Sequence, residues 1–320
     1  MRSDQSLEPT SVGVTALLMA AAATCLLLLS SCAHAEKPTD DERAMVAESI
    51  ENLEMQADKL AAGTGASCPK EFSALETGRT LRISMFYGYD KYEGKAYDRV
   101  NARSMSHILT KQCRGKLSAC GFSIVSRSKP AVRLMRTLDS RKIEINLFTS
   151  SLTEDAKQGM NPDAMYWEQD KLSRSVNGRL YRELVESDIV FYMGHSRLGG
   201  GMEFNTQPGV TTLFNAIFRF PMHPVLKALR QRPTKLKMIG MFSCDSNKYF
   251  RRDFHGANPS LSLILTTGDI DALPAEQVSL GALDAVLSQK CARAFHESMM
   301  SVNEPNPRMT YLIRRGNHLN

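Results

Sequence analysis

Two stretches of the chain decide its fold: DIVFYMGHSRLGGG, residues 188–201, and KLKMIGMFSCDSNKYF, residues 235–250. In each, an apolar run of strand length ends at a chemically capable side chain, His195 in the first and Cys244 in the second. Because the carboxyl ends of neighbouring parallel strands meet at one edge of a sheet, we expect these side chains to lie together. An imidazole within reach of a thiol can take the thiol proton, which a nucleophilic cysteine requires near neutral pH.

Strand-length apolar runs alternate with helical patterns along most of the chain. The predicted strands are Leu81–Tyr87, Phe122–Ser126, Ile143–Phe148, Ile189–Met193, Lys237–Phe242 and Leu261–Thr266. The predicted helices are Asp41–Leu60, Arg99–Gln112, Leu172–Glu186, interrupted stretches within Thr211–Arg230, and Val278–Met299. This alternation predicts an α/β fold, a mostly parallel sheet with helices on both faces. The predicted domain is residues 77–320, after a signal segment (1–31) and a tether with an N-terminal helix (32–76).

The N-terminal segment indicates export. Residues 12–29 carry no charge and lead into Leu29-Ser30-Ser31-Cys32, which resembles the lipobox of bacterial lipoproteins. That resemblance implies cleavage before Cys32, lipidation of Cys32 with palmitate among the acyl chains, and a place in the bacterial cell envelope on the periplasmic or outer surface. Ala33-His34-Ala35 offers a competing site for cleavage without lipid, and an uncleaved membrane anchor is the third alternative.

The composition is that of a globular protein with a moderate positive charge. The 320 residues have a formal net charge of +6, and because residues 1–31 contain one Arg, one Asp and one Glu, the remainder carries +7. Such a charge fits proximity to an anionic lipid or polymer, and it does not by itself indicate a nucleic-acid partner. No metal or organic cofactor is expected from the sequence.

The cysteine count indicates two disulfides and one free thiol. Of the seven cysteines, one lies in the signal segment and Cys32 takes the lipid, which leaves five. An odd number in an oxidising compartment leaves one thiol unpaired, and Cys244 is the candidate. The other four allow three pairings; Cys113 and Cys120 flank a turn-like span, and Cys68 and Cys291 remain by elimination. The alternative is that all five are reduced or buried thiols.

The order strand–His, helix, strand–Cys, with about fifty residues between the pair, resembles the caspase-like cysteine peptidases, the group of caspases, gingipains and separases. The likeness covers roughly residues 81–287 and is specific at 189–201 and 238–250. It implies that His195 is the general base or proton donor and that Cys244 attacks the scissile carbonyl of a peptide or protein substrate. It also implies an oxyanion site of backbone N–H groups near the Cys and in the loop after the His, where Gly199, Gly200 and Gly201 let a substrate approach closely.

Two positions depart from that family pattern and keep other functions open. Ser196 follows the His where the family usually has Gly, and Ser243 precedes the Cys where many members have Ala. A non-catalytic envelope lipoprotein could keep the same fold as a binding module.

A serine hydrolase is another alternative. Its nucleophile would be Ser196 in a Gly-His-Ser elbow, with Asp269 or Asp271 as the acid and His318 as the base, although Leu198 stands where the tight elbow needs a small residue.

Two further clusters are weaker candidates. Cys244 and Asp245 with Asp253 and His255 would be metal ligands, but their spacing is not that of a zinc site. Asp269 and Asp271 would line an acidic pocket for a basic substrate side chain, or else are solvated turn carboxylates.

Overall fold

The computed structural model describes residues 40–63, 66–75, 78, 80–89, 91–92, 95–152, 166–205, 209–301 and 311–314. The predicted signal segment, the lipid site at Cys32, the competing cleavage site at residues 33–35 and the alternative base His318 lie outside these residues. Within the described ranges, no helix has both the length and the apolar character needed to cross a bilayer.

Helices and strands alternate along the described chain. The helices are α2 (Asp40–Ala62), α3 (Tyr97–Thr110), α4 (Tyr166–Glu186), α5 (Gly209–Phe218), α6 (Met222–Arg230), α7 (Ser246–Ala257), α8 (Ala272–Leu287) and α9 (Ala292–Met300), with short 3₁₀ helices η1 (Pro69–Leu75) and η3 (Arg197–Gly199). The strands are β1 (Thr80–Tyr87), β2 (Lys91–Tyr92), β3 (Lys95–Ala96), β4 (Ser123–Arg127), β5 (Ala131–Leu138), β6 (Arg141–Thr149), β7 (Ile189–Met193), β8 (Met238–Phe242), β9 (Ser262–Thr266) and β10 (Tyr311–Arg314).

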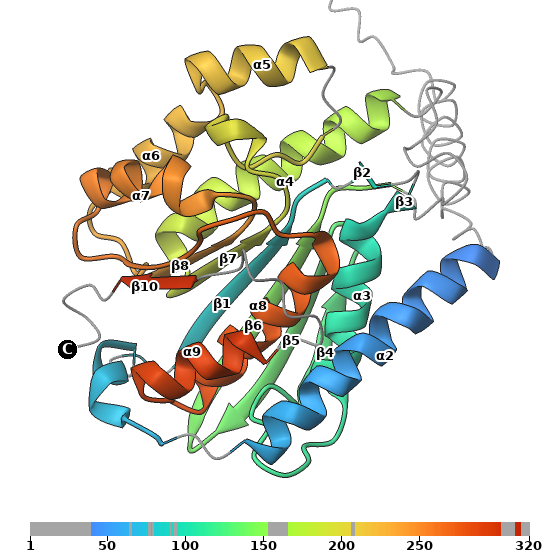
Figure 1. Cartoon of the computed structure of the whole chain (residues 1–320), viewed down its shortest axis with the longest axis vertical. Coiled ribbons are helices and arrows are strands. Elements are labelled where there is room, and N and C mark those ends of the chain that lie inside the picture. The colour runs from blue at the N-terminus through green and yellow to red at the C-terminus, as the bar shows by residue number, and fades with distance from the viewer. Residues whose placement is uncertain are drawn as a thin grey trace, which may run out of the picture. The chain divides into compact units, whose positions relative to one another are not determined.

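Eight of the described strands form one sheet in the order β10-β9-β8-β7-β1-β6-β5-β4 (Figure 1). The central strands from β9 to β6 run parallel, and antiparallel strands close both edges. All residues of β7, β8 and β9 are buried, which explains their continuous apolar sequences, because a parallel sheet is covered on both faces. The predicted α/β fold with a mostly parallel sheet is confirmed.

Two groups of buried apolar side chains fill the two faces of this sheet. Helices α2, α3, α8 and α9 pack on one face, where Ile83 and Met85 of β1 lie among side chains such as Leu53 and Leu283. Helices α4, α6 and α7 pack on the other face, against β-strand residues such as Tyr192. Figure 1 shows α2, α3, α8 and α9 in front of the central strands, and α4, α6 and α7 above β7 and β8.

The structure differs from the predicted elements at several places. Strands β2, β3, β5 and β10 and helix α7 are absent from the predicted set. The predicted helix Val278–Met299 is two helices, α8 and α9, and α8 begins earlier, at Ala272. Gln289, with φ of 52°, breaks the helix, and the next turn is held by the bond between Cys291 and Cys68.

Both predicted disulfides are present. Cys113 bonds to Cys120 and Cys68 bonds to Cys291, with Cα–Cα distances of 5.0 and 4.9 Å. The alternative of five reduced thiols is therefore wrong. Cys244 is the free cysteine among the described residues, as the parity of the cysteines predicts.

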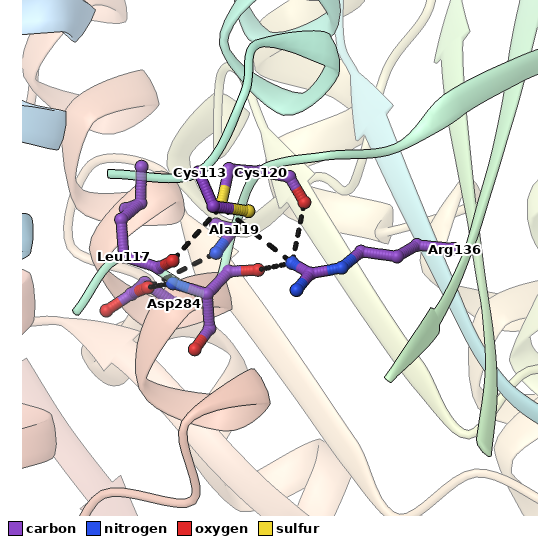
Figure 2. The surroundings of a disulfide bond; sticks show 7 residues. Cys113, Leu117, Ala119, Cys120, Arg136 and Asp284 are labelled. Carbon is purple, nitrogen blue, oxygen red and sulfur yellow. Dashed lines mark hydrogen bonds between the residues drawn. A yellow bond between two sulfur atoms is a disulfide. The ribbon is translucent and has the colours of Figure 1, made fainter. Parts of the chain in front are cut away.

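The loop closed by Cys113–Cys120 is fastened to the sheet and to α8 by charged side chains (Figure 2). The Asp284 carboxylate accepts hydrogen bonds from the backbone N–H groups of Ser118 and Ala119, at 2.7 and 3.2 Å. Arg136 of β5 donates to the carbonyls of Ser118 and Cys120, at 2.9 and 2.7 Å. Lys290 completes the site by pairing with buried Asp284 at 2.9 Å, so the carboxylate is not left uncompensated.

Candidate active site

Strand register brings His195 and Cys244 to the same level at the carboxyl edge of the sheet. Strands β7 and β8 are parallel neighbours, and Met193 lies opposite Phe242. His195 and Cys244 each follow that pair by two residues, on strands that are about 4.8 Å apart in any sheet. Met193 and Phe242 also point to the same face, the one covered by α2, α3 and α8. The two side chains of the predicted dyad line one cavity.

Tyr192 holds the backbone on which His195 stands. The Tyr192 hydroxyl donates to the His195 carbonyl at 3.1 Å and accepts from the Glu203 backbone N–H at 3.1 Å, so it ties both ends of the loop together. Gly194 makes this close approach possible: it has φ of 154°, and a Cβ there would lie 2.8 Å from the Tyr192 hydroxyl. A side chain at this position would therefore displace the loop that presents His195.

Cys244 stands in a tight turn between β8 and α7. Asp245, the next residue, has the left-handed φ of 50° and begins α7. The turn is fixed from β9 and the residues after it, because the Thr266 N–H donates to the Ser246 hydroxyl at 2.8 Å and the Asp245 N–H donates to the Gly268 carbonyl at 2.9 Å. Cys244 is half-buried, and its Sγ lies 3.5 Å from the Ile270 carbonyl oxygen, to which the thiol donates.

The surroundings of Cys244 favour the protonated thiol. Burial raises the pKa of Cys244, and the nearby carboxylates of Asp269 and Asp271 raise it further, because a thiolate would be poorly solvated and close to negative charge. In the resting protein Cys244 is therefore a thiol at neutral pH. Formation of a thiolate needs a base that accepts the proton, and His195 is the side chain of that kind on the same cavity wall.

The cavity beside His195 and Cys244 has a volume of about 280 Å³. Its walls are largely apolar and come from four parts of the chain: the ends of β7 and β8, α2, α3 and the turn into α8. Two exposed carboxylates, Glu48 of α2 and Asp271 before α8, stand at its rim. The cavity therefore combines an apolar wall with acidic groups at its mouth.

A smaller cavity adjoins the first and shares Asn101, Gly194, Ala272 and Ala275 with it. Asn101 is 4% exposed, and its amide donates to the Ala272 carbonyl at 3.5 Å while its Oδ1 is buried without a partner. An unpartnered buried acceptor is costly, so a donor group in the cavity would stabilise this side chain. Asn101 is thus a polar contact available on an otherwise apolar wall.

Asp98 lies at the back of the smaller cavity and fastens the end of β6 to α3. Its carboxylate accepts from the Ser150 and Ser151 N–H groups, at 3.0 and 2.9 Å, and from the Ser151 hydroxyl at 2.6 Å. Complete burial nevertheless raises the pKa of Asp98 from 3.8 to about 6. The desolvation of the charge thus outweighs the hydrogen bonds that favour it.

The structure does not place the three predicted loop glycines on the cavity wall. A Cβ on Gly199 would contact Tyr249 at 3.0 Å, one on Gly200 would contact the backbone of α5 at 3.1 Å, and one on Gly201 would contact Pro221 at 2.9 Å. Their lack of side chains serves close packing of the loop against α5, α6 and α7. Their role in an oxyanion or substrate loop stays a prediction.

The serine alternative gains no support from the loop geometry. Ser196 does not line the cavity and has ordinary right-handed dihedrals, φ −81° and ψ −16°, whereas the serine of a nucleophile elbow is held in a strained turn. The left-handed residues of this loop are Arg197 and Leu198 instead. Asp269 is exposed and does not line the cavity, and the base His318 lies outside the described residues.

The metal alternative also finds no support where the structure can be described. Among the described residues, no three His, Cys, Asp or Glu side chains are grouped so that they could hold a metal ion. Asp253, one of the proposed ligands, forms an ion pair with Arg219.

Sequence patterns did not identify Glu48, Asn101 or Asp98 as site residues. Each lies on a helix whose periodic apolar positions indicate a core face, and nothing local shows which polar positions face the strand ends. Glu48 reaches the cavity only because α2 crosses α3 and α8.

Comparison with models of known protein families, with curated proteins and with solved structures finds no match to this chain.

Proposed function

We propose that this chain is a lipid-anchored cysteine peptidase of the bacterial cell envelope with a caspase-like sheet, in which Cys244 is the nucleophile and His195 the proton acceptor and donor. The observation that supports the proposal is the equal offset of His195 and Cys244 beyond the Met193–Phe242 pair, together with their common cavity. The lipid on Cys32 and the envelope location come from the lipobox resemblance.

The proposed reaction hydrolyses a peptide bond in two steps. The Cys244 thiol passes its proton to His195 while Sγ forms a bond to the scissile carbonyl carbon. The carbonyl oxygen becomes an oxyanion held by the backbone N–H of Cys244, since the next two N–H groups of the turn already donate to the Gly268 and Ser243 carbonyls. The C–N bond breaks as His195 returns the proton to the leaving amine. Water then attacks the thioester and gives a proton to His195, and the C–S bond breaks to release the acid and restore the thiol.

The resting thiol is compatible with this chemistry. Burial and Asp271 raise the pKa of Cys244, so no thiolate forms before the substrate is attacked. The proton passes from Cys244 to His195 during the attack itself. A substrate with a positive charge near Asp271 would offset the negative field and lower the pKa of Cys244 when it binds.

The cavity favours a basic substrate side chain next to the scissile bond. Its apolar wall suits the methylene stem of Lys or Arg, and the Glu48 and Asp271 carboxylates at the rim suit the cationic head. The unpartnered Oδ1 of Asn101 provides a further acceptor inside. This extends the predicted acidic pocket, with Glu48 as the partner of Asp271 in place of Asp269.

Covalent labelling with peptidyl chloromethyl ketones tests the proposal directly. Three probes would differ only in the terminal side chain, Lys, Leu or Glu, and the modified residue would be mapped by mass spectrometry. We expect labelling at Cys244, fastest with the Lys probe, and at least tenfold slower in His195→Ala. His296→Ala, a change on α9 remote from the cavity lining, is the matched control and should label at the wild-type rate.

The outcomes separate the activity from its specificity. No labelling of Cys244 by any probe, in a protein that retains its fold by circular dichroism, would reject the nucleophile. Labelling that depends on His195 but is equal for all three probes would keep the nucleophile and reject the basic substrate. Cleavage of the corresponding fluorogenic peptides, lost in Cys244→Ala, would complete the test.

The second candidate is a non-catalytic module that binds a basic peptide in the same cavity. The observation that favours it is the thiol itself, which is protonated and donates to the Ile270 carbonyl. For this function Cys244→Ala would bind a Lys-containing peptide as tightly as the wild type, and Asp271→Asn would bind it more weakly. Isothermal titration with uncleavable peptides detects this binding, and the absence of Cys244 labelling and of peptide cleavage by the wild type separates this function from the peptidase.

A further inference from the structure

Helix α5 and the turn after it carry an exposed aromatic surface, here called the α5 patch: Leu213, Phe214, Ile217, Phe218 and Phe220. These side chains are between 48% and 65% exposed, although each is large and apolar. The three rings contact one another, with centroids 4.4 Å apart for Phe214–Phe218 and 5.6 Å for Phe218–Phe220. A contiguous cluster of this kind, unlike single exposed apolar residues, marks an interaction surface.

The helix is attached to the body of the protein by its other side. Asn215 of α5 is buried, and its amide donates to Glu203 at 3.5 Å. Arg219, directly after α5, donates to the carbonyls of Gly199 and Tyr249 at 2.9 and 3.1 Å and pairs with Asp253 of α7. These contacts hold α5 beside α7 and leave the aromatic side outward, at the margin where Figure 1 shows α5.

The segment from α5 to the start of β9 holds the net positive charge of the protein. Residues 209–260 contain nine Lys and Arg against two Asp, a net charge of +7, which equals the whole excess of residues 32–320. Seven of the nine are exposed: Lys227, Arg230, Arg232, Lys235, Lys248, Arg251 and Arg252. Of the two acids, Asp253 is already paired with Arg219. Five of the seven lie on α6, which follows the patch directly, and on α7, whose one acid is Asp253, so these two helices present a largely positive surface.

We propose that the α5 patch docks on an anionic lipid membrane, with the aromatic side chains in the interfacial region and the Lys and Arg of α6 and α7 on the lipid headgroups. Phe and Leu on one side of a helix and basic residues around it are the features of a surface-lying membrane helix. A second copy of the chain fits less well, because a two-fold contact through the patch would bring the two basic surrounds together. This inference is independent of the peptidase proposal and of the lipid at Cys32.

A single indole at the patch tests the inference without interference from the N-terminal segment. Trp167 is the one tryptophan of the chain, so Phe218→Trp in a Trp167→Phe background reports the patch alone. The full chain would be mixed with phosphatidylcholine vesicles that contain or lack phosphatidylglycerol, with bromine-labelled acyl chains as the quencher. With the anionic vesicles we expect the emission of the indole at position 218 to shift to the blue and to be quenched. High salt should reduce both effects because the attraction is electrostatic.

The matched control is Met55→Trp in the same background, at an exposed apolar position of α2 flanked by Glu51 and Asp58. Its emission should not be quenched. Arg251→Gln with Arg252→Gln should lower the affinity for the anionic vesicles, read from the quenching at position 218, by about 25-fold, from about fivefold for each charge near an anionic surface.

Three outcomes would overturn the inference. One is equal quenching at positions 55 and 218, another is the absence of quenching at 218, and the third is a blue shift at 218 that grows with protein concentration without vesicles. The last outcome would assign the patch to a second copy of the chain.

Discussion

Asp98 gives a prediction whose size follows from the structure. Its pKa is about 6 in the folded protein, against 3.8 for an exposed aspartate, because burial outweighs the three hydrogen bonds that favour the charge. The folded protein therefore holds this proton more tightly than the unfolded chain does. The stabilising contribution of Asp98 is complete below the lower pKa and is lost as the pH rises through the higher one.

The magnitude is about 3 kcal/mol, from a shift of about two pKa units at about 1.4 kcal/mol each. The assay is urea unfolding of the wild type and Asp98→Asn from pH 4 to pH 8 at constant ionic strength. The difference in unfolding free energy, wild type minus variant, should fall by about 2.4 kcal/mol between pH 4 and pH 7, because Asp98 of the unfolded chain is already partly ionised at pH 4 and the variant has no proton to lose at this position.

Asp58→Asn, at an exposed position of α2, is the matched control, and its difference from the wild type should change little over the same range. The reasoning would be refuted if the difference in unfolding free energy, wild type minus Asp98→Asn, rose with pH. Such a rise would mean that the N–H groups of Ser150 and Ser151 stabilise the carboxylate more than burial destabilises it.

Three further predictions concern the site and its supports. Asp271→Asn should lower the pKa of Cys244 and speed its alkylation by iodoacetamide at pH 8 by roughly twofold to threefold, as befits an exposed charge; an unchanged rate would remove Asp271 from the electrostatics of the thiol. Tyr192→Phe should cost about 1–3 kcal/mol of unfolding free energy in urea, because the His195 carbonyl loses its buried donor, and an unaltered midpoint would show that water replaces the hydroxyl. Replacing Cys113 together with its partner by Ser should cost about 2.5 kcal/mol of unfolding free energy in urea, the chain-entropy value for so short a loop, and an unchanged urea midpoint would show that this bond does not constrain the unfolded chain.

Several elements could be predicted because their signals are local. The runs Ile189–Met193 and Met238–Phe242 are apolar at every position, which is typical of strands buried on both faces. Helix α7 could have been found in the same way, since Phe250, Phe254 and Ala257 recur at helical spacing and are buried. Strand β5 could not, because only half-buried positions surround its one fully buried residue and its partners lie on β4 and β6.

The sequence by itself determined the alternation of strands and helices, the odd number of cysteines that leaves Cys244 free, and the strand ends that carry His195 and Cys244. All of these depend on neighbours along the chain. Only the tertiary structure decided that Glu48 and Asn101 line the cavity, that the loop glycines pack against α5 to α7, and that Cys244 is held as a thiol. The physical reason is that burial and electric field at a side chain are set by residues distant in sequence, whose positions depend on how the helices pack on the sheet.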